Sequence, residues 1–131
     1  MTDTPNTPEA SAAQNVQDTA ARAAEAFGAL VETMALLRAP GGCPWDAEQT
    51  HASLIRYLVE EAYEVVEAVE TGGEPNMPLL REELGDVLLQ VVFHSDIAAA
   101  SPQGFDIVQV VEGLVQKLRS RHPDVFAAES E

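Results

Sequence analysis

The sequence predicts an all-α protein, built as a bundle of four long helices that associates at least as a dimer. Apolar residues recur at three- and four-residue steps in four segments, and breaks rich in Gly and Pro separate these segments. The composition agrees, because 46% of the residues are hydrophobic and only 5% are aromatic. A chain of 131 residues is long enough for one domain with a core but too short for two.

Both ends of the chain are expected to lie outside the helical domain, which we place at residues 19–126. Residues 1–18 are rich in Thr, Pro, Ala, Asn and Gln and contain almost no large apolar residue, so a disordered N-terminal tail is predicted. Residues 127–131 are predicted to form a frayed C-terminus.

The first two helices are delimited by clear start and stop signals. The first is expected from Thr19 to Arg38, where a Pro-Gly-Gly break follows. The second can be capped by Thr50 or Ser53 and runs to about Glu70. The apolar stripe of this second helix is bordered by two carboxylates three residues apart, those of Glu61 and Glu64.

The third helix, expected at 79–99, is apolar around nearly its whole circumference, so we expect it to be buried on most sides. One narrow polar stripe interrupts this surface, formed by Glu83, Asp86, Gln90 and His94. Because unpaired buried charge is costly, the stripe needs partners inside the protein, best supplied by a metal ion and by the acidic edge of the second helix. We expect Gly85 to allow a close helix approach at this site.

The fourth helix, expected at 105–120, ends among basic residues that are scarce in this chain. Lys117 and Arg121 are four residues apart and share a helix face. They are either cations favourably placed at a helix C-terminus or a binding site for a phosphate chain.

Two acidic pairs on consecutive helices suggest a metal site. Four facing carboxylates repel one another, and such groups either take up protons or bind a hard cation such as Mg²⁺, Mn²⁺ or Ca²⁺. An acidic run on a helix is more often a solvated face, but the second pair lies within an apolar helix. A di-iron site would need Glu-x-x-His pairs, which neither acidic helix has.

The formal net charge of −15 argues against binding to nucleic acid polymers or to anionic membranes. The sequence has no long apolar run and no signal peptide, and its single cysteine cannot form an intramolecular disulfide. A cytoplasmic location is therefore expected. Trp45, in the loop before the second helix, either covers the core or stacks on a nucleobase.

Several separated blocks of the sequence together resemble the MazG family of all-α nucleoside triphosphate pyrophosphohydrolases. Two of these blocks hold the acidic pairs, Glu61-x-x-Glu64 and Glu83-x-x-Asp86, and the resemblance covers roughly residues 30–126. The flanking blocks are Gly42-Cys43-Pro44-Trp45-Asp46 with Gln49-Thr50-His51, then Tyr57-Leu58-Val59-Glu60, Val87-Leu88-Leu89-Gln90-Val91-Val92-Phe93-His94 and Arg121-His122-Pro123-Asp124-Val125-Phe126.

The resemblance implies Mg²⁺-dependent hydrolysis of nucleoside triphosphates by water attack at the α-phosphate. The products would be a nucleoside monophosphate and pyrophosphate, an activity suited to nucleotide-pool housecleaning. It also implies that Mn²⁺ could substitute for Mg²⁺ and that the metal ligands are Glu61, Glu64, Glu83 and Asp86.

The resemblance also implies that Lys117 and Arg121 hold the triphosphate. The remaining roles are our own mechanistic hypotheses, in which Trp45 reaches the base. Glu60 is a candidate water-orienting base, although a solvated glutamate is the simpler interpretation. Gln90 and His94 would support the metal ligands without binding metal themselves.

Two features depart from the family pattern, and two other functions remain as alternatives. Many relatives carry two such domains where this sequence has one, and relatives often have a basic residue at the place of Ala47. The alternatives are a non-enzymatic helical interaction module and a dUTP or phosphoribosyl-ATP pyrophosphohydrolase. The Cys-Pro-Trp-Asp and His-Pro-Asp-Val-Phe blocks argue against the latter.

Overall fold

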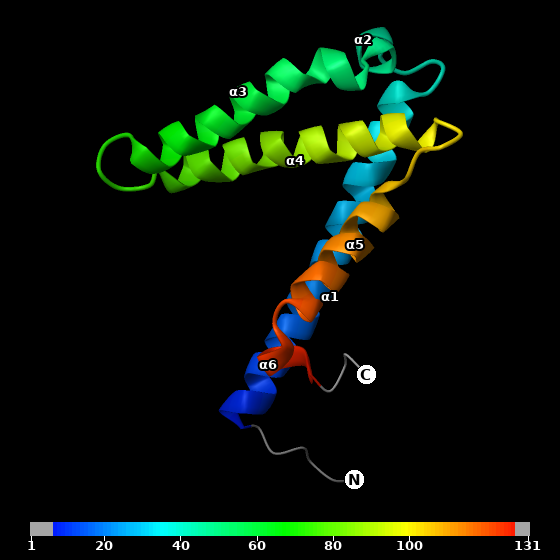
Figure 1. The fold of residues 1–131 in the computed structure, drawn as a ribbon. Helices are drawn as coiled ribbons and strands as arrows, with labels where there is room; N and C mark the ends of the chain where they lie inside the picture. Colours follow the sequence, from blue (N-terminus) through cyan, green and yellow to red (C-terminus); the bar gives the residue numbers. More distant parts are fainter. Residues whose placement is uncertain (1–6, 128–131) are drawn as a thin grey trace.

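A computed structural model describes residues 7–127, and all regular secondary structure in this part of the chain is helical (Figure 1). The predicted all-α class is confirmed. The four long helices are α1, α3, α4 and α5, and two short helices, α2 and α6, lie between or after them. Their bounds are α1 (Pro8–Arg38), α2 (Pro44–Glu48), α3 (His51–Glu70), α4 (Met77–Ala99), α5 (Ile107–Ser120) and α6 (Pro123–Phe126).

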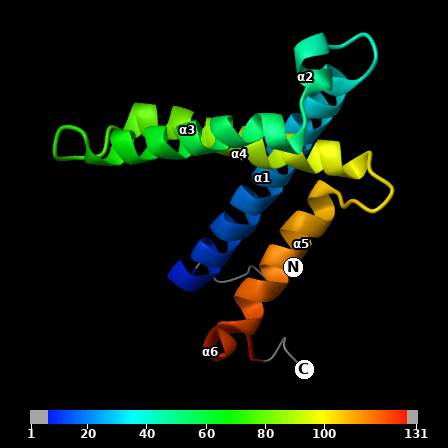
Figure 2. The same cartoon turned by 45° about the horizontal axis from the view of Figure 1, so that its top comes forward.

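The helices form two arms that meet at one end, as Figures 1 and 2 both show. In the first arm, which we call the site arm, α3 and α4 pack along each other as an antiparallel hairpin. The second arm consists of α1 and α5, which leave the junction in the same general direction but do not pack closely on each other within residues 7–127. One chain therefore supplies the four expected helices without closing them into a single bundle.

The hydrophobic core lies at the junction of the two arms. Its fully buried residues come from α1, α3 and α4: Met34, Leu54, Val92 and Phe93. A salt bridge reinforces the junction, because Arg38 Nη1 donates to Asp96 Oδ2 at 2.6 Å. Arg38 Nε also donates to the backbone oxygen of Asp46, at 3.2 Å. These contacts hold the end of α1 against α2 and the end of α4.

The predicted tail boundary is wrong, because α1 begins at Pro8 instead of at Thr19. Thr7 caps the helix by accepting a hydrogen bond from the Ala10 amide at 3.1 Å, and Pro8 occupies the first turn. The segment has no apolar stripe, but its many alanines are the strongest helix formers. Residues 1–6 of the predicted tail and 128–131 of the predicted frayed end lie outside the described part.

A side chain would be excluded at Gly42, for which no such constraint was predicted, and would be tolerated at Gly85, for which one was. Gly42 precedes α2, where a loop was expected, and a Cβ at Gly42 would overlap the carbonyl oxygens of Leu36 and Leu37. By contrast, a Cβ at Gly85 would meet nothing within 4 Å. The expected close approach at Gly85 therefore does not occur within one chain.

The expected burial of α4 on most sides is also wrong for a single chain. The face of α4 toward α3 and the junction is buried, but Leu84 is 51% exposed and Leu88 and Val91 are exposed as well. These apolar side chains occupy the face that the chain itself leaves uncovered.

Candidate metal centre

Local sequence signals place the two acidic pairs on well-defined helices. Thr50 and Ser53 form a capping box at the start of α3, with Thr50 Oγ1 accepting from the Ser53 amide at 3.0 Å and Ser53 Oγ accepting from the Thr50 amide at 2.8 Å. Asn76 caps α4 by accepting from the Leu79 amide at 3.2 Å. Antiparallel packing of α3 on α4 then brings the middle of one helix beside the first half of the other.

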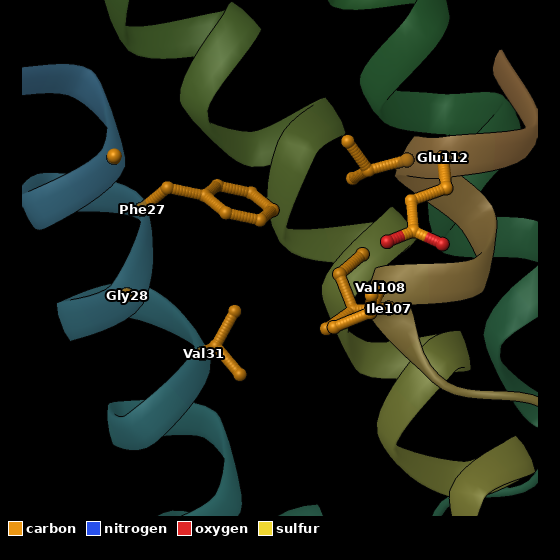
Figure 3. A pocket seen from close by; sticks show the side chains of 8 residues that line it. Phe27, Gly28, Val31, Ile107, Val108 and Glu112 are labelled. Atoms are coloured by element: carbon orange, nitrogen blue, oxygen red, sulfur yellow. The ribbon is translucent and has the colours of Figure 1, made fainter. Parts of the chain in front are cut away.

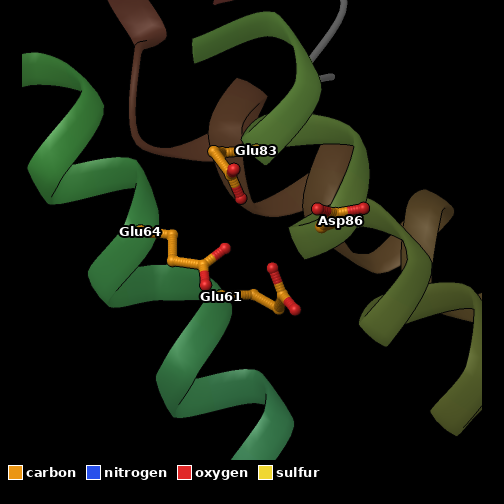
Figure 4. Close-up of side chains that lie close together, drawn as sticks. All are labelled: Glu61, Glu64, Glu83 and Asp86. Atoms are coloured by element: carbon orange, nitrogen blue, oxygen red, sulfur yellow. The ribbon is translucent and has the colours of Figure 1, made fainter. Parts of the chain in front are cut away.

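The four predicted ligands lie together across the α3–α4 interface (Figure 4). Glu61 and Glu64 extend from α3 toward Glu83 and Asp86 on α4. Each side chain offers one carboxylate oxygen to a group whose members all lie within 4.8 Å of one another. Burial differs among the four, because Glu83 is only 8% exposed, Glu61 and Asp86 are half-buried and Glu64 is exposed.

The electrostatics of this cluster disfavour four simultaneous negative charges. A hydrogen bond with Glu64, followed by burial and the charges of the neighbouring carboxylates, raises the pKa of Glu83 to about 7. Burial, followed by the charges of Glu64 and Asp86, raises the pKa of Glu61. Without a cation, the cluster therefore holds protons that isolated carboxylates would release.

The arrangement fits a hard divalent cation. Oxygens on opposite sides of one Mg²⁺ lie about 4.2 Å apart and those around one Ca²⁺ about 5 Å apart, so small side-chain adjustments would enclose such an ion. Two buried oxygens of the cluster, Glu61 Oε2 and Glu83 Oε2, have no hydrogen-bond partner, as expected for atoms that bind a cation. The cluster can therefore hold a metal ion.

Glu60 does not belong to this cluster. Its side chain is exposed on α3, where its charge acts on Arg56, one turn earlier. This position agrees with the simpler interpretation of Glu60 as a solvated glutamate.

Trp45 packs over the core and is also exposed beside a pocket. Its ring makes edge-to-face contacts with Tyr57 and Phe93, at centroid distances of 5.9 and 6.5 Å, so it covers the core. The same side chain is 50% exposed and lines a pocket of about 530 Å³ with Arg56 and Tyr57. Arg56 and Tyr57 were not predicted as site residues; the one available signal was their position on α3, one to two turns before Glu61.

The structure does not bring Lys117 and Arg121 to the carboxylates within one chain. Lys117 lies in the last turn of α5 and Arg121 is its C-cap, at the far end of the second arm. Within residues 7–127, α5 packs on α4 and α6 but makes no contact with α3. Within one chain, Lys117 and Arg121 therefore lie apart from the acidic cluster.

Among the described residues, none of the helices is long and apolar enough to cross a membrane.

A helical hairpin that gathers four carboxylates into one cation-sized group defines a helical protein with a candidate metal centre between two helices. Comparison of the sequence identifies the family more closely. The model of the MazG nucleotide pyrophosphohydrolase domain matches residues 49–126, and the chain belongs to that family. The match includes all four carboxylates, Lys117 and Arg121, but begins after Trp45.

Individual relatives agree with this assignment. The chain is 52% identical over 100 residues to the nucleoside triphosphate pyrophosphohydrolase/pyrophosphatase MazG of Thermotoga maritima. The aligned region covers 76% of this chain and 38% of that relative. The chain is 53% identical over 105 residues to a nucleoside triphosphate pyrophosphohydrolase of Mycolicibacterium smegmatis, covering 77% and 31%. An Escherichia coli K12 protein of the same name is 43% identical over 102 residues, covering 77% and 37%. The chain thus spans about a third of the length of these relatives.

Proposed function

We propose that this chain hydrolyses nucleoside triphosphates to nucleoside monophosphates and pyrophosphate, with Mg²⁺ as its cofactor and Mn²⁺ as a substitute. The observation that carries the proposal is the group of four carboxylates across α3 and α4, in a chain that belongs to the MazG family. The relatives named above as nucleoside triphosphate pyrophosphohydrolases support the reaction class. A cytoplasmic role in nucleotide-pool housecleaning is part of the proposal.

In this proposal, Glu61, Glu64, Glu83 and Asp86 hold the cation. When bound, Mg²⁺ supplies positive charge that neutralises the phosphate oxygens as negative charge develops on them. A carboxylate oxygen of the cluster accepts a hydrogen bond from the attacking water and so orients it toward the α-phosphorus. The water gives a proton to that carboxylate as its oxygen bonds to the α-phosphorus, the bond from the α-phosphorus to the α–β bridging oxygen breaks, and pyrophosphate leaves.

The pocket beside Trp45 is our proposed position for the nucleoside. It lies at the start of α3, with Tyr57 only one turn before Glu61, so a triphosphate at the carboxylates could place its base near the indole. Half of the Trp45 surface is exposed there, and an aromatic face can stack on any base.

We further propose that the working form is at least a homodimer. The second arm exposes a row of apolar side chains on α5, and Figure 3 shows Phe27 and Val31 of α1 facing Ile107 and Val108 of α5 across an apolar pocket. That pocket has a volume of about 450 Å³, and a neighbouring one of about 590 Å³ reaches Leu88 of α4. Apolar surface of this extent marks an interface, and a second copy would complete the four-helix arrangement. The exposed apolar residues of α5 are Val108, Val111, Leu114, Val115 and Leu118.

A dimer would also bring in the missing cations. Because Lys117 and Arg121 lie on the arm that does not reach the cluster, we propose that each active site combines carboxylates of one subunit with these two basic residues of the other. Their charges would offset that of the leaving pyrophosphate.

Product analysis tests the reaction. The protein is incubated with a panel of nucleoside triphosphates and Mg²⁺, and products are separated by ion-exchange chromatography. The proposal expects nucleoside monophosphate and pyrophosphate in equal amounts; orthophosphate and nucleoside diphosphate would contradict the assigned bond. No turnover, together with a melting temperature that does not respond to Mg²⁺, would instead favour a non-enzymatic interaction module.

Subunit mixing tests the shared site. Glu64→Gln and Arg121→Ala proteins, each inactive alone, are unfolded, mixed in equal amounts and refolded together. If the two residues act across the interface, about a quarter of wild-type activity returns, because half of the dimers are hybrids and each hybrid has one intact site of two. If they act within one chain, no site in the mixture is intact and no activity returns.

A further inference from the structure

Four buried polar atoms without hydrogen-bond partners occur in the described part of the chain, and all four belong to the α3–α4 interface or its polar stripe. They are Glu61 Oε2, Glu83 Oε2, Gln90 Oε1 and His94 Nε2. A cation in the acidic cluster accounts for the first two. The other two need a different partner, because buried polar atoms are almost always hydrogen-bonded to protein or ordered water.

Gln90 lies between the acidic cluster and a histidine pair, His51 and His94, at the end of the site arm. His51, the first residue of α3, lies against His94, with the two Nδ1 atoms 2.8 Å apart and the rings stacked at a centroid distance of 5.1 Å. Gln90 is one turn before His94 and one turn after Asp86, and it is only 5% exposed. Polar groups thus continue along α4 from the cluster to the histidine pair.

The contact between the two rings constrains their protonation. One Nδ1 must donate a hydrogen and the other must accept it, so at least one ring is neutral. Burial, followed by the charge of His51, lowers the pKa of His94, which favours the neutral form of that ring. A hydrogen on the buried nitrogen of His94, Nε2, is the tautomer that matches Gln90 Oε1, a buried acceptor without a partner one turn earlier on α4. In that tautomer His94 Nδ1 accepts from His51.

We propose that Gln90 and His94 are positioning residues of the acidic cluster, joined to each other by a buried water and anchored to α3 through His51. The water accepts from His94 Nε2–H and donates to Gln90 Oε1, so both partnerless atoms are satisfied. The network fixes the register of α3 on α4, and that register sets the separation between the carboxylates of the two helices. Neither residue binds the cation; their loss changes how well the cluster does so.

This inference rests on the proposed cation site, and its test uses one variant that a purely structural role would leave harmless. Gln90→Leu replaces a buried amide by an apolar side chain of similar size. Without the network this exchange removes a partnerless polar group and is neutral or stabilising, whereas in the network it leaves the water and His94 without their acceptor. We expect the variant to melt slightly below the wild-type temperature without Mg²⁺ and to need about 10-fold more Mg²⁺ for half of the Mg²⁺-induced stabilisation. An unchanged Mg²⁺ requirement would overturn the proposal.

A matched control and a second pair of variants separate positioning from damage to the helix. Ser95 is also buried on α4, but its hydroxyl donates to the Val91 carbonyl at 2.7 Å, so Ser95→Ala should leave the Mg²⁺ requirement unchanged. His51→Ala should raise the Mg²⁺ concentration needed for half of the stabilisation. His51→Gln keeps a donor for His94, so its Mg²⁺ requirement should lie between those of His51→Ala and the wild type. Equal effects of both His51 substitutions would contradict the anchoring role.

Nitrogen NMR of ¹⁵N-histidine-labelled full chain gives a readout independent of the cation. At pH 7.5 we expect His94 as the neutral Nε2–H form and His51 as the Nδ1–H form, with or without Mg²⁺. Protonated or Nδ1–H His94 would overturn the network. Absence of any Mg²⁺ effect on wild-type melting would refute the cation site itself, while the NMR result would still decide the network.

Discussion

The two arms of this chain distribute polar and apolar residues in opposite ways. The site arm buries a carboxylate, an amide and a hydroxyl, those of Glu83, Gln90 and Ser95, between packed helices. The second arm exposes most of the large apolar side chains of α5 and contributes no fully buried residue from that helix. The contrast indicates that each arm lacks a different partner: the acidic cluster of the site arm lacks a cation, and the second arm lacks apolar cover.

Charge follows the same division. All four members of the acidic cluster lie on α3 and α4, whereas three of the seven basic residues, Lys117, Arg119 and Arg121, lie at the end of α5. An antiparallel or crossed association of two copies would supply both missing components at once, since it would cover α5 and bring cations toward carboxylates. The predictions below test this division, beginning with the largest effect.

Removing one negative charge from the site arm should abolish function while leaving the fold intact. Glu64→Gln and Asp86→Asn each remove a ligand charge, so we expect turnover to fall by about 10³-fold or more. Helical circular dichroism should remain unchanged, because both positions are at the border of the interface. Glu67→Gln, also exposed on α3 but outside the cluster, is the matched control and should keep full activity. Full activity in a cluster variant would remove that residue from the ligand set.

Adding a charge to the second arm should also reduce activity, in this case by weakening association of the two copies. Val111→Asp places a carboxylate on the apolar face of α5 that we propose to be buried in the dimer, at an expected cost of about 2–4 kcal/mol in association free energy. Sedimentation velocity should show more monomer, and activity should fall although the site arm is unaltered. Val16→Asp, at an exposed apolar residue early in α1, serves as control. A fully active monomeric Val111→Asp protein would refute the shared site.

The pH dependence of stability should distinguish the site arm with and without its cation. The pKa of Glu83 is raised from 4.5 to about 7, so between these values the folded chain keeps a proton that the unfolded chain has released. The stability of the Mg²⁺-free protein should therefore fall as pH rises through this window, and the loss should be complete above it. Because the cation binds the deprotonated cluster, stabilisation by Mg²⁺ should grow over the same window.

Denaturant titrations from pH 5 to 8.5, with EDTA or with saturating Mg²⁺, measure both trends. Glu83→Gln cannot titrate, so it should show a flatter pH profile and a smaller response to Mg²⁺. His94, whose pKa is lowered, adds stability as pH rises, so the decisive quantity is the difference between the wild type and Glu83→Gln. Equal pH profiles of the two proteins in EDTA would show that Glu83 does not retain a proton as described.

The sequence predicted the site arm more completely than the second arm, for physical reasons. Capping residues such as Thr50 and the border positions of Glu61 and Glu64 are local features, and helical periodicity determines where they lie on α3. The apolar surface of α4 indicated that something must cover it, but periodicity cannot tell whether the same chain or another copy does so. The two-arm arrangement therefore could not be predicted from the sequence.

Other differences have equally specific causes. The early start of α1 was missed because alanine stabilises a helix without leaving an apolar stripe to detect. The contact between His51 and His94 was missed although both residues were visible, since it depends on the antiparallel register of α3 and α4. From the sequence, the only information on this register was the expectation that Glu61 faces Glu83 and Asp86.

The smallest expected effect compares the helix caps of the two arms. Thr50→Ala removes the capping box of α3 beside the core residue Leu54, so we expect a loss of about 1 kcal/mol in the free energy of unfolding. Thr7→Ala removes the equivalent bond to Ala10 on α1, but the first turns of α1 are exposed. Fraying there should increase hydrogen exchange locally and leave global unfolding by urea unchanged. Equal losses in the two variants would mean that the start of α1 packs on something as firmly as α3 does, which within the proposed dimer could only be the second copy.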